Sequence, residues 1–213
     1  MKLSKHNMLL YAVTDRSWLN GKTLSEEVEE AIIGGATFIQ LREKNLDSDD
    51  FLSEAIEIRK ICNKYKVPFV IDDNVEIAIK SGADGVHLGQ NDMNISQARA
   101  LLGKNKIIGA TARTVEQAVR AEQEGADYIG SGAVFATSTK SDTVPLSYEN
   151  LCKICRSVSI PVVAIGGINT GNVKYLTGSG ISGIAVVSGI FKSDNVRESA
   201  GTLKEMIIDI LEE

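Results

Sequence analysis

Short runs of apolar and β-branched residues recur along the whole chain, and amphipathic segments separate them. In the separating segments apolar residues stand three and four positions apart, which is the spacing of one helix face. Strands that alternate with helices of this length predict βαβ units and a parallel sheet. The eight predicted strands lie in "LLYAVTD" (9–15), "TFIQLRE" (37–43), "PFVIDD" (68–73), "GVHLGQ" (85–90), "KIIGATA" (106–112), "DYIGSGAVF" (127–135), "PVVAIGGI" (161–168) and "GIAVVSG" (183–189). The clearest predicted helices are "SEEVEEAII" (25–33), "DDFLSEAIEIRKICNKY" (49–65) and "VEQAVRAEQ" (115–123).

A short sequence motif recurs four times where a predicted helix ends and the next strand begins. The four copies are "GGATF", "SGADG", "EGADY" and "SGISG", and each has a glycine where a helix end requires left-handed backbone: Gly35, Gly82, Gly125 and Gly180. Eight βα units close naturally into a barrel, so we predict one (β/α)8 TIM barrel domain over residues 1–213. The alternative is a doubly wound open sheet, which predicts a "GxGxxG" fingerprint after the first strand. The chain has "TDRSWLNGKT" there instead.

Composition and charge narrow the classes of partner and compartment. The formal net charge of -5 and the pI near 5.2 argue against nucleic acid, because binding a phosphate backbone requires an excess of Lys and Arg. The apolar run near the N-terminus, Met8 to Val13, is too short for a signal segment or a membrane span. Three scattered cysteines, Cys62, Cys152 and Cys155, are typical of a cytoplasmic protein. The sequence leaves open whether the chain forms a homo-oligomer.

The stretch "FIQLREK" (38–44) raises the question of what its polar side chains contact. Gln40, Arg42 and Lys44 fall at every second position and therefore share one face of the strand. Burying two cations without partners would be strongly destabilising. We therefore expect Ile39 and Leu41 to face the helices, while the three polar side chains point toward the open end of the barrel and a ligand there.

Polar residues gather at the predicted C-terminal strand ends, where such barrels have their active sites. Asp73 and Asp92 follow adjacent strands, and two hard oxygen ligands with open positions suit Mg2+ held jointly with phosphates. Each carboxylate could equally cap the following helix. The metal and diphosphate interpretation is favoured because Arg42, Lys44 and Lys140 can reach the same space. The other polar residues at these ends are Asp15, Asp72, Gln90, Thr111 and Arg113.

Two glycine-containing strand ends and one long loop are candidates for a second anion site. "GGI" (166–168) and "VSG" (187–189) follow the seventh and eighth strands, where phosphate sites are commonly built in these barrels. A helix is expected to begin near Gly171. Turn glycines alone would be the simpler alternative. "TSTK" (137–140) supplies three hydroxyls and an ammonium in an unusually long connection, which indicates either a binding loop or a solvated polar loop.

The two histidines do not predict a nucleophilic mechanism. His6 lies in a polar N-terminal segment, and His87 lies within a predicted strand, where a structural histidine that orients its neighbours is expected. The sequence contains no evident Ser-His or Cys-His arrangement, which disfavours covalent catalysis. Electrostatic catalysis on an anionic substrate remains.

Six motifs occur in order and in register, and together they resemble the thiamine-phosphate synthase (thiamine phosphate pyrophosphorylase) family. They are "QLREK", "DDNVEIA", "GADGVHLGQND", "GADYIGSGAVFATSTK", "PVVAIGGI" and "VVSGI". The resemblance covers nearly the whole chain. It implies a transferase that joins 4-amino-2-methyl-5-(diphosphooxymethyl)pyrimidine to 4-methyl-5-(2-phosphoethyl)thiazole, or its carboxylated form, and releases pyrophosphate with Mg2+ bound.

The resemblance also implies roles for individual residues. The pyrimidine diphosphate would be held by Gln40, Arg42, Lys44, Asp72 and Thr111, and the Mg2+ ion by Asp73 and Asp92. Lys140 would contact the leaving pyrophosphate and, with Arg42 and Lys44, would be catalytic. The thiazole phosphate would be held by Thr137, Ser138, Thr139, Gly167, Val187 and Ser188.

Three positions depart from the family pattern. Asp72 stands where Asn is common, Thr111 where Ser is common, and Ala133 where Pro is frequent. Thr111 keeps its hydroxyl, whereas Asp72 adds a negative charge near a diphosphate. Two rival functions are a thiazole tautomerase on the same barrel and a non-catalytic phosphate-binding barrel. The tautomerase is expected to lack the complete diphosphate and metal set and to have a proton-shuttling histidine on the rim.

Overall fold

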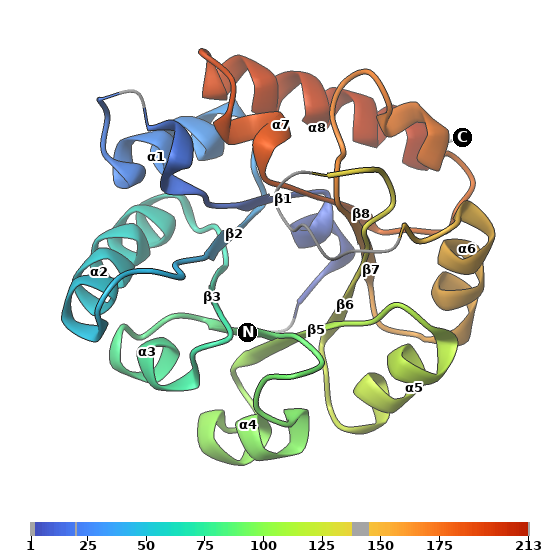
Figure 1. The fold of residues 1–213 in the computed structure, drawn as a ribbon, viewed down its shortest axis with the longest axis horizontal. Helices are drawn as coiled ribbons and strands as arrows, with labels where there is room; N and C mark the ends of the chain where they lie inside the picture. The colour runs from blue at the N-terminus through green and yellow to red at the C-terminus, as the bar shows by residue number, and fades with distance from the viewer. Residues whose placement is uncertain (1–2, 20, 138–144, 213) are drawn as a thin grey trace.

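The computed structural model describes residues 3–19, 21–137 and 145–212, and its centre is a closed barrel of parallel strands (Figure 1). Each strand pairs with the next along the chain, and the last strand pairs with the first. All eight predicted strands are therefore confirmed, and the open-sheet alternative is wrong. The strands are β1 (Leu10–Val13), β2 (Phe38–Leu41), β3 (Phe69–Asp72), β4 (Gly85–Leu88), β5 (Ile107–Thr111), β6 (Tyr128–Gly132), β7 (Val162–Ile165) and β8 (Gly183–Val186).

Helices form a ring around the barrel, as Figure 1 shows. The three helices expected from periodicity are present as α1, α2 and α5. The helix expected near Gly171 is wrong: a turn precedes a single 3-10 turn, η3 (Val173–Leu176). The α-helices are α1 (Leu24–Gly34), α2 (Ser48–Tyr65), α3 (Val75–Lys80), α4 (Ile95–Leu102), α5 (Val115–Gln123), α6 (Tyr148–Ser157), α7 (Ser188–Phe191) and α8 (Val196–Glu212). Two further 3-10 turns are η1 (Lys5–Met8) and η2 (Arg16–Trp18).

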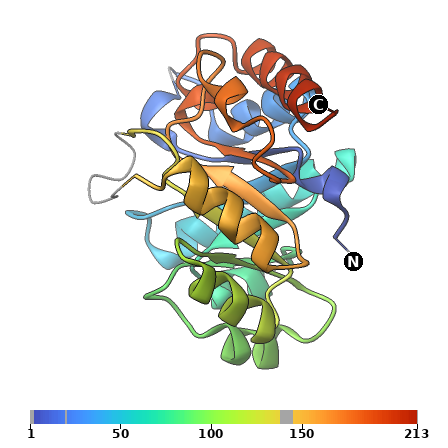
Figure 2. The same ribbon diagram turned by 90° about the vertical axis from the view of Figure 1, so that its right-hand side faces the viewer.

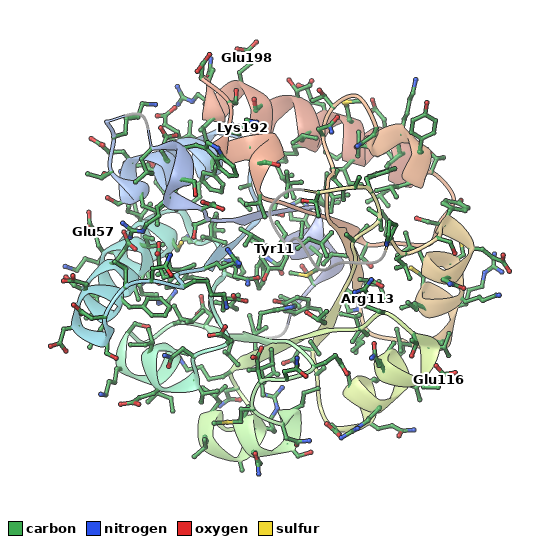
Figure 3. All side chains as sticks on the ribbon, in the orientation of Figure 1. Tyr11, Glu57, Arg113, Glu116, Lys192 and Glu198 are labelled. Carbon is green, nitrogen blue, oxygen red and sulfur yellow. The ribbon has the colours of Figure 1, made fainter. Side chains whose placement is uncertain are left out.

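The alternation of side chains along the strands divides the core into two layers. Ile39 and Leu41 point outward into the larger cluster between the barrel and the helices, as expected. Inward-facing side chains form a smaller cluster inside the barrel, which includes Tyr11, Phe38 and Tyr128. Figure 3 shows Tyr11 near the barrel centre. The inner layer is the base on which the polar end of the barrel is built.

The predicted glycine turns have the backbone that the pattern demands. Gly35, Gly82, Gly125 and Gly180 all have positive φ, between 72° and 121°, which side chains with a Cβ rarely adopt. The loops that lead from a helix into the next strand are therefore tight, and the longer connections follow the strands. Functional groups therefore accumulate at the carboxyl ends of the strands.

The amino ends of the strands are closed by the N-terminal segment. Figure 2 shows η1 on this side of the barrel, away from the carboxyl ends. Met8 of η1 is fully buried in the inner cluster. The open end of the barrel is thus the opposite one. None of the helices within the described residues has the length and apolar character needed to cross a membrane.

Candidate active site

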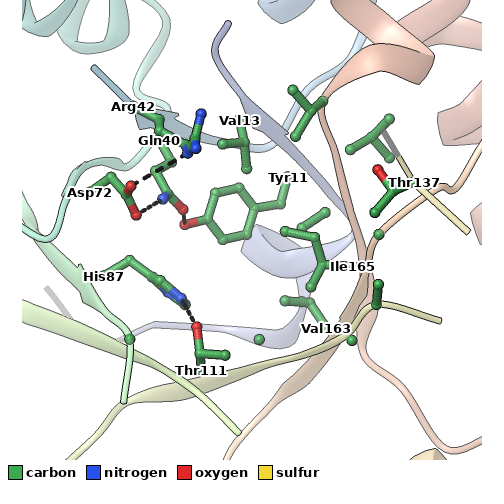
Figure 4. Close-up of a pocket in the computed structure, with 18 of the residues that line it drawn as sticks. Tyr11, Val13, Gln40, Arg42, Asp72, His87, Thr111, Thr137, Val163 and Ile165 are labelled. Atoms are coloured by element: carbon green, nitrogen blue, oxygen red, sulfur yellow. Dashed lines mark hydrogen bonds and ion pairs between the residues drawn. The ribbon is translucent and has the colours of Figure 1, made fainter. Parts of the chain in front are cut away.

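A pocket of about 390 Å³ lies at the carboxyl ends of the strands. Its floor is formed by the inner layer of the barrel, and its walls by residues that follow the strands (Figure 4). Residues from all eight strands contribute, so positions that are far apart in sequence face one space. The pocket therefore lies where the sequence analysis placed the site.

One side of the pocket is a cluster of cations and carboxylates from β2 and β3. Asp72, buried at the end of β3, accepts a hydrogen bond from Gln40 Nε2 at 2.6 Å. Its Oδ2 lies 3.7 Å from Arg42 Nε and 3.1 Å from Lys44 Nζ. Lys44 also forms an ion pair with Asp73. The face shared by Gln40, Arg42 and Lys44 is thus oriented by Asp72, while Arg42 Nε has no hydrogen-bond partner among the described residues.

Asp73 and Asp92 are close enough to influence each other electrostatically. Burial raises the pKa of the Asp73 carboxyl above its usual value; the Lys44 contact opposes this rise, whereas Asp72 and Asp92 add to it. Asp92 comes from the turn after β4, where its Oδ2 accepts from the Gly89 amide at 2.6 Å. A carboxyl whose charged form is disfavoured by burial and by neighbouring carboxylates is stabilised by a bound cation.

Asp73 and Asp92 are hard oxygen donors of the kind that Mg2+ prefers. Among the described residues there is no group of three or more His, Cys, Asp or Glu side chains with metal-ligand geometry. Mg2+ is commonly bound through one or two carboxylates together with substrate phosphates and water. Asp73 and Asp92 could hold such an ion, with its remaining ligands coming from a phosphorylated substrate and water.

A second layer of charge lies behind Arg42 and Lys44. Glu43, between them in sequence, is buried and accepts from Arg16 Nε at 2.8 Å. Arg16 also donates to Glu54 of α2 at 2.7 Å. Burial raises the pKa of Glu54 to about 7, with Arg16 opposing and Glu43 adding to the effect. This cluster ties the segment that carries Arg42 and Lys44 to η2 and α2.

The Glu54 carboxyl should make folding stability depend on pH. Its pKa in the folded protein is about 7 against an ordinary 4.5, so the folded state binds this proton more tightly. The resulting stabilisation is complete below about pH 4.5 and is lost as pH rises through about 7. Relative to Glu54→Gln, we expect the wild-type free energy of unfolding to fall by about 2 kcal/mol over this range. Urea denaturation at several pH values would measure it, and parallel curves for the two proteins would contradict it.

Two residues at the base of the pocket, Tyr11 and Tyr128, were not recognised from the sequence. Tyr11 hydrogen-bonds to Gln40, and its hydroxyl oxygen lies 2.8 Å from that of Tyr128. His87 contacts Tyr128 through Nδ1 and Thr111 through Nε2, both at 3.0 Å. His87 therefore orients neighbours, as expected. The alternation within "LLYAV" could have identified Tyr11 as inward-facing, but no sequence signal joins it to Tyr128.

The side of the pocket opposite the carboxylates is formed largely by backbone. Gly166 and Gly167 follow β7 with φ of 101° and 68°, and Gly167 packs tightly against the Ala136 backbone and the Phe135 Cβ. Val187 and Ser188 line the same pocket at the start of α7. Thr137 also lines it. Backbone and hydroxyl groups of this kind are suited to binding an oxyanion.

Substituting Gly167 with alanine should destabilise the protein by about 2 kcal/mol. A Cβ at this position would stand 2.3 Å from the Ala136 carbonyl oxygen, in addition to the cost of positive φ. Gly82→Ala is the matched control, because Gly82 has a φ of 72° but nothing within 4 Å of an added Cβ. Urea denaturation should show a larger loss for Gly167→Ala. Equal losses would mean that the close approach costs nothing.

Most of the selected residues meet in this one pocket. Those that line it are Gln40, Arg42, Lys44, Asp72, Asp73, Asp92, Thr111, Thr137, Gly167, Val187 and Ser188. Ser138, Thr139 and Lys140 lie outside the described residues. Gln90 and Arg113, which were recognised only as polar strand-end residues, also line the pocket. Asp15 instead caps η2 by accepting from the Ser17 amide at 2.9 Å.

Comparison with known proteins agrees with the sequence resemblance. The family model described as thiamine monophosphate synthase matches residues 10–190. A thiamine-phosphate synthase from Ruminiclostridium cellulolyticum is 50% identical over 206 residues, covering 97% of this chain and 98% of the relative. A thiamine-phosphate synthase from Clostridium novyi is 48% identical over 198 residues, covering 92% of this chain and 97% of the relative.

A solved structure gives the same result at the level of the fold. The thiamine phosphate pyrophosphorylase from Pyrococcus furiosus superposes with a TM-score of 0.90 and 40% identity, covering 97% of this chain and 98% of that one. A geranylgeranylglyceryl phosphate synthase from Thermoplasma acidophilum, 15% identical with a TM-score of 0.68, shares the fold. The family match, the identity of the curated relatives and the barrel with its polar open end all agree, and the chain belongs to the thiamine monophosphate synthase family of transferases.

Proposed function

We propose that this chain joins a pyrimidine to a thiazole in the pocket at the open end of the barrel. The substrates are 4-amino-2-methyl-5-(diphosphooxymethyl)pyrimidine and 4-methyl-5-(2-phosphoethyl)thiazole, or its carboxylated form, and the products are thiamine phosphate and pyrophosphate. The observation that carries this proposal is that one pocket has a charged side and a backbone-lined side. Two substrates that each bear phosphate can therefore bind with their reacting ends facing each other.

The charged side suits the diphosphate. Arg42 Nε is buried and lacks a hydrogen-bond partner among the described residues, which supports an anionic ligand as its partner. Lys44 already lies between Asp72 and Asp73, at the position where the diphosphate would enter. Gln40, held by Asp72, would contact the pyrimidine. Lys140, from the 137–140 loop, would supply a further cation to the leaving pyrophosphate.

Asp73 and Asp92 would hold the Mg2+ ion. When bound, the ion supplies positive charge that neutralises the diphosphate as it departs. The raised pKa of the Asp73 carboxyl supports this assignment, because burial and two neighbouring carboxylates disfavour its charge unless a cation is present. Lys44, the ammonium paired with Asp73 in the structure, would then be available to the diphosphate.

The opposite side suits the thiazole phosphate. Gly167, Val187 and Ser188 would offer backbone and hydroxyl groups, and Thr137, Ser138 and Thr139 would add three hydroxyls. Holding the phosphate there would direct the thiazole nitrogen toward the pyrimidine methylene carbon. Positioning two reactants in this way lowers the entropic part of the barrier.

The reaction requires no nucleophilic side chain or general base. If the carbon-oxygen bond breaks first, electrons leave with pyrophosphate, and the thiazole nitrogen then attacks the pyrimidine-methyl cation. Arg42, Lys44 and Lys140 would stabilise the negative charge that develops on the leaving group. The pocket floor, made of Tyr11 and Val13 and their neighbours, would restrict water around the cation.

One assay tests the proposal. The protein is mixed with both substrates and Mg2+, and pyrophosphate release is followed. We expect release that requires the thiazole phosphate and stops when EDTA removes the metal. Release without the thiazole phosphate or the metal, or no release at all, would contradict the proposed function.

Neither rival function is supported by a specific observation. The relatives described above are thiamine-phosphate synthases, and the likeness to them extends over nearly the whole chain. The predicted diphosphate and metal residues of a synthase are present, whereas His87 lies on the pocket floor and is hydrogen-bonded at both ring nitrogens. A non-catalytic barrel would bind the phosphates without releasing pyrophosphate, so the same assay distinguishes it.

The chain is also proposed to work in the cytoplasm. Cys62, Cys152 and Cys155 are free thiols in the structure, and none is paired in a disulfide. Burial raises the pKa of the Cys62 and Cys155 thiols to about 12, which keeps them protonated and unreactive. Such cysteines suit a reducing compartment.

A further inference from the structure

Six polar side chains hydrogen-bond in an unbroken line across the floor of the pocket. Each comes from a different strand, and Figure 4 shows both ends of the line. In order they are Asp72, Gln40, Tyr11, Tyr128, His87 and Thr111. Because a hydroxyl has one proton to donate, the direction of one bond in such a line constrains the next.

Asp72 sets the direction at one end. Its carboxylate pairs with the Lys44 ammonium and can only accept hydrogen bonds, so Gln40 turns its NH2 group toward it, at 2.6 Å. The Gln40 carbonyl oxygen therefore faces Tyr11 and accepts from its hydroxyl. With its proton used in this way, the Tyr11 oxygen accepts from the Tyr128 hydroxyl at 2.8 Å.

The directions of the remaining hydrogen bonds, from Tyr128 to Thr111, follow in the same way. Burial raises the pKa of both tyrosines well above the usual value, so both hydroxyls keep their protons. The Tyr128 proton is directed at Tyr11, and its oxygen must accept from a proton on His87 Nδ1, 3.0 Å away. A neutral His87 then has a lone pair at Nε2, to which the Thr111 hydroxyl donates at 3.0 Å.

We propose that this directed line of hydrogen bonds makes Thr111 a hydrogen-bond acceptor toward the pocket, so that a ligand must present a donor there. A ring amino group has this chemistry, and its identification with the amino group of the pyrimidine substrate rests on the proposed function. Tyr11, Tyr128 and His87 are then positioning residues, because they act on this group through Thr111. Asp72 stands where the family commonly has Asn. Because a carboxylate cannot donate a hydrogen bond, Asp72 fixes the orientation of the Gln40 amide.

The His87 tautomer tests the line in the absence of any substrate. The chain has two histidines, and His6 is exposed, so a His6→Asn background leaves the imidazole signals of His87 alone. Nitrogen-15 NMR distinguishes a ring nitrogen that carries a proton from one with a lone pair. We expect the proton on Nδ1 in the neutral ring. A proton on Nε2 would overturn the proposal.

A remote substitution sharpens this test. Tyr11→Phe keeps the ring that packs 4.6 Å from Phe38 but removes the acceptor for the Tyr128 proton. Tyr128 can then donate to His87 Nδ1, so the His87 proton should move to Nε2, although Tyr128 stands between the two residues. Ser131→Ala is the control, since it removes a buried hydroxyl that bonds to the Ala112 carbonyl, outside the line. A Tyr11→Phe protein that keeps its proton on Nδ1 would overturn the proposal.

Ligand binding tests the acceptor at Thr111. Calorimetry would compare 4-amino-2-methyl-5-hydroxymethylpyrimidine with the analogue in which a methoxy group, which cannot donate, replaces the amino group. We expect the wild-type and Thr111→Ser proteins to lose about tenfold more affinity on this replacement than Thr111→Val does. An equal loss in all three would overturn the role of Thr111. Failure of the proposed function is distinguishable, because it would appear as absent pyrophosphate release while the His87 tautomer stays as expected.

Discussion

Replacing Asp92 with asparagine is expected to lower kcat on the order of 100-fold to 1,000-fold while the protein stays folded. Asparagine keeps an oxygen that can accept from the Gly89 amide, which holds the turn after β4. What it loses is the negative charge facing the proposed magnesium position. Steady-state kinetics with a Mg2+ titration would measure both the fall in kcat and a higher metal concentration for half activity.

Asp194→Asn is the matched control for this substitution. Asp194 is an exposed carboxylate between α7 and α8 that does not line the pocket. Its replacement removes the same charge and should leave kcat and the metal requirement unchanged. Wild-type kinetics in Asp92→Asn would show that the metal is held elsewhere.

Truncating Arg42 to alanine is expected to reduce kcat/KM for the pyrimidine diphosphate on the order of 100-fold or more. Arg42 Nε lies 3.7 Å from Asp72 Oδ2 and has no hydrogen-bond partner among the described residues. Arg42→Lys should recover only part of the loss, because an ammonium restores the charge but not the planar fork that binds two phosphate oxygens. Initial rates at varied concentrations of each substrate would show which of the two substrates the substitution affects.

The control is Arg120→Ala, which removes an exposed arginine paired with Glu124 on α5. It should leave both Michaelis constants unchanged. The KM for the thiazole phosphate should also stay nearly constant in Arg42→Ala. A loss confined to the thiazole phosphate would assign Arg42 to the wrong end of the pocket.

The fold could be predicted because its signals are local and repeated. Each strand is a short apolar run, and the positive φ of residues such as Gly35 and Gly125 follows from where a helix must end. The exception is the segment after β7, where a helix was expected near Gly171 and a 3-10 turn begins at Val173. There Asn169 and Asn172 bond to nearby backbone, including the Gly167 carbonyl, and these contacts favour a turn.

The charged side of the site could also be predicted, because alternation along one strand puts Gln40 and Arg42 on one face. The floor could not. Tyr11 and Tyr128 lie more than a hundred residues apart in the chain, and their 2.8 Å contact exists only because the barrel closes. The Arg16, Glu43 and Glu54 cluster was missed for the same reason, because its three residues come from separate segments that only the fold brings together.

Three buried aromatic rings connect the choice of substrate with the stability of the barrel. The rings of Tyr11, Phe38 and Tyr128 lie with centroids 4.6, 5.5 and 5.8 Å apart, and all three are almost completely buried. All three fill the barrel interior, and the Tyr11 ring also lines the pocket. An engineer who trims these rings to admit a larger pyrimidine would open a void in the packing. Variation for new substrates is better directed at the rim, at positions such as Gln90 and Arg113, where side chains line the pocket without filling the interior.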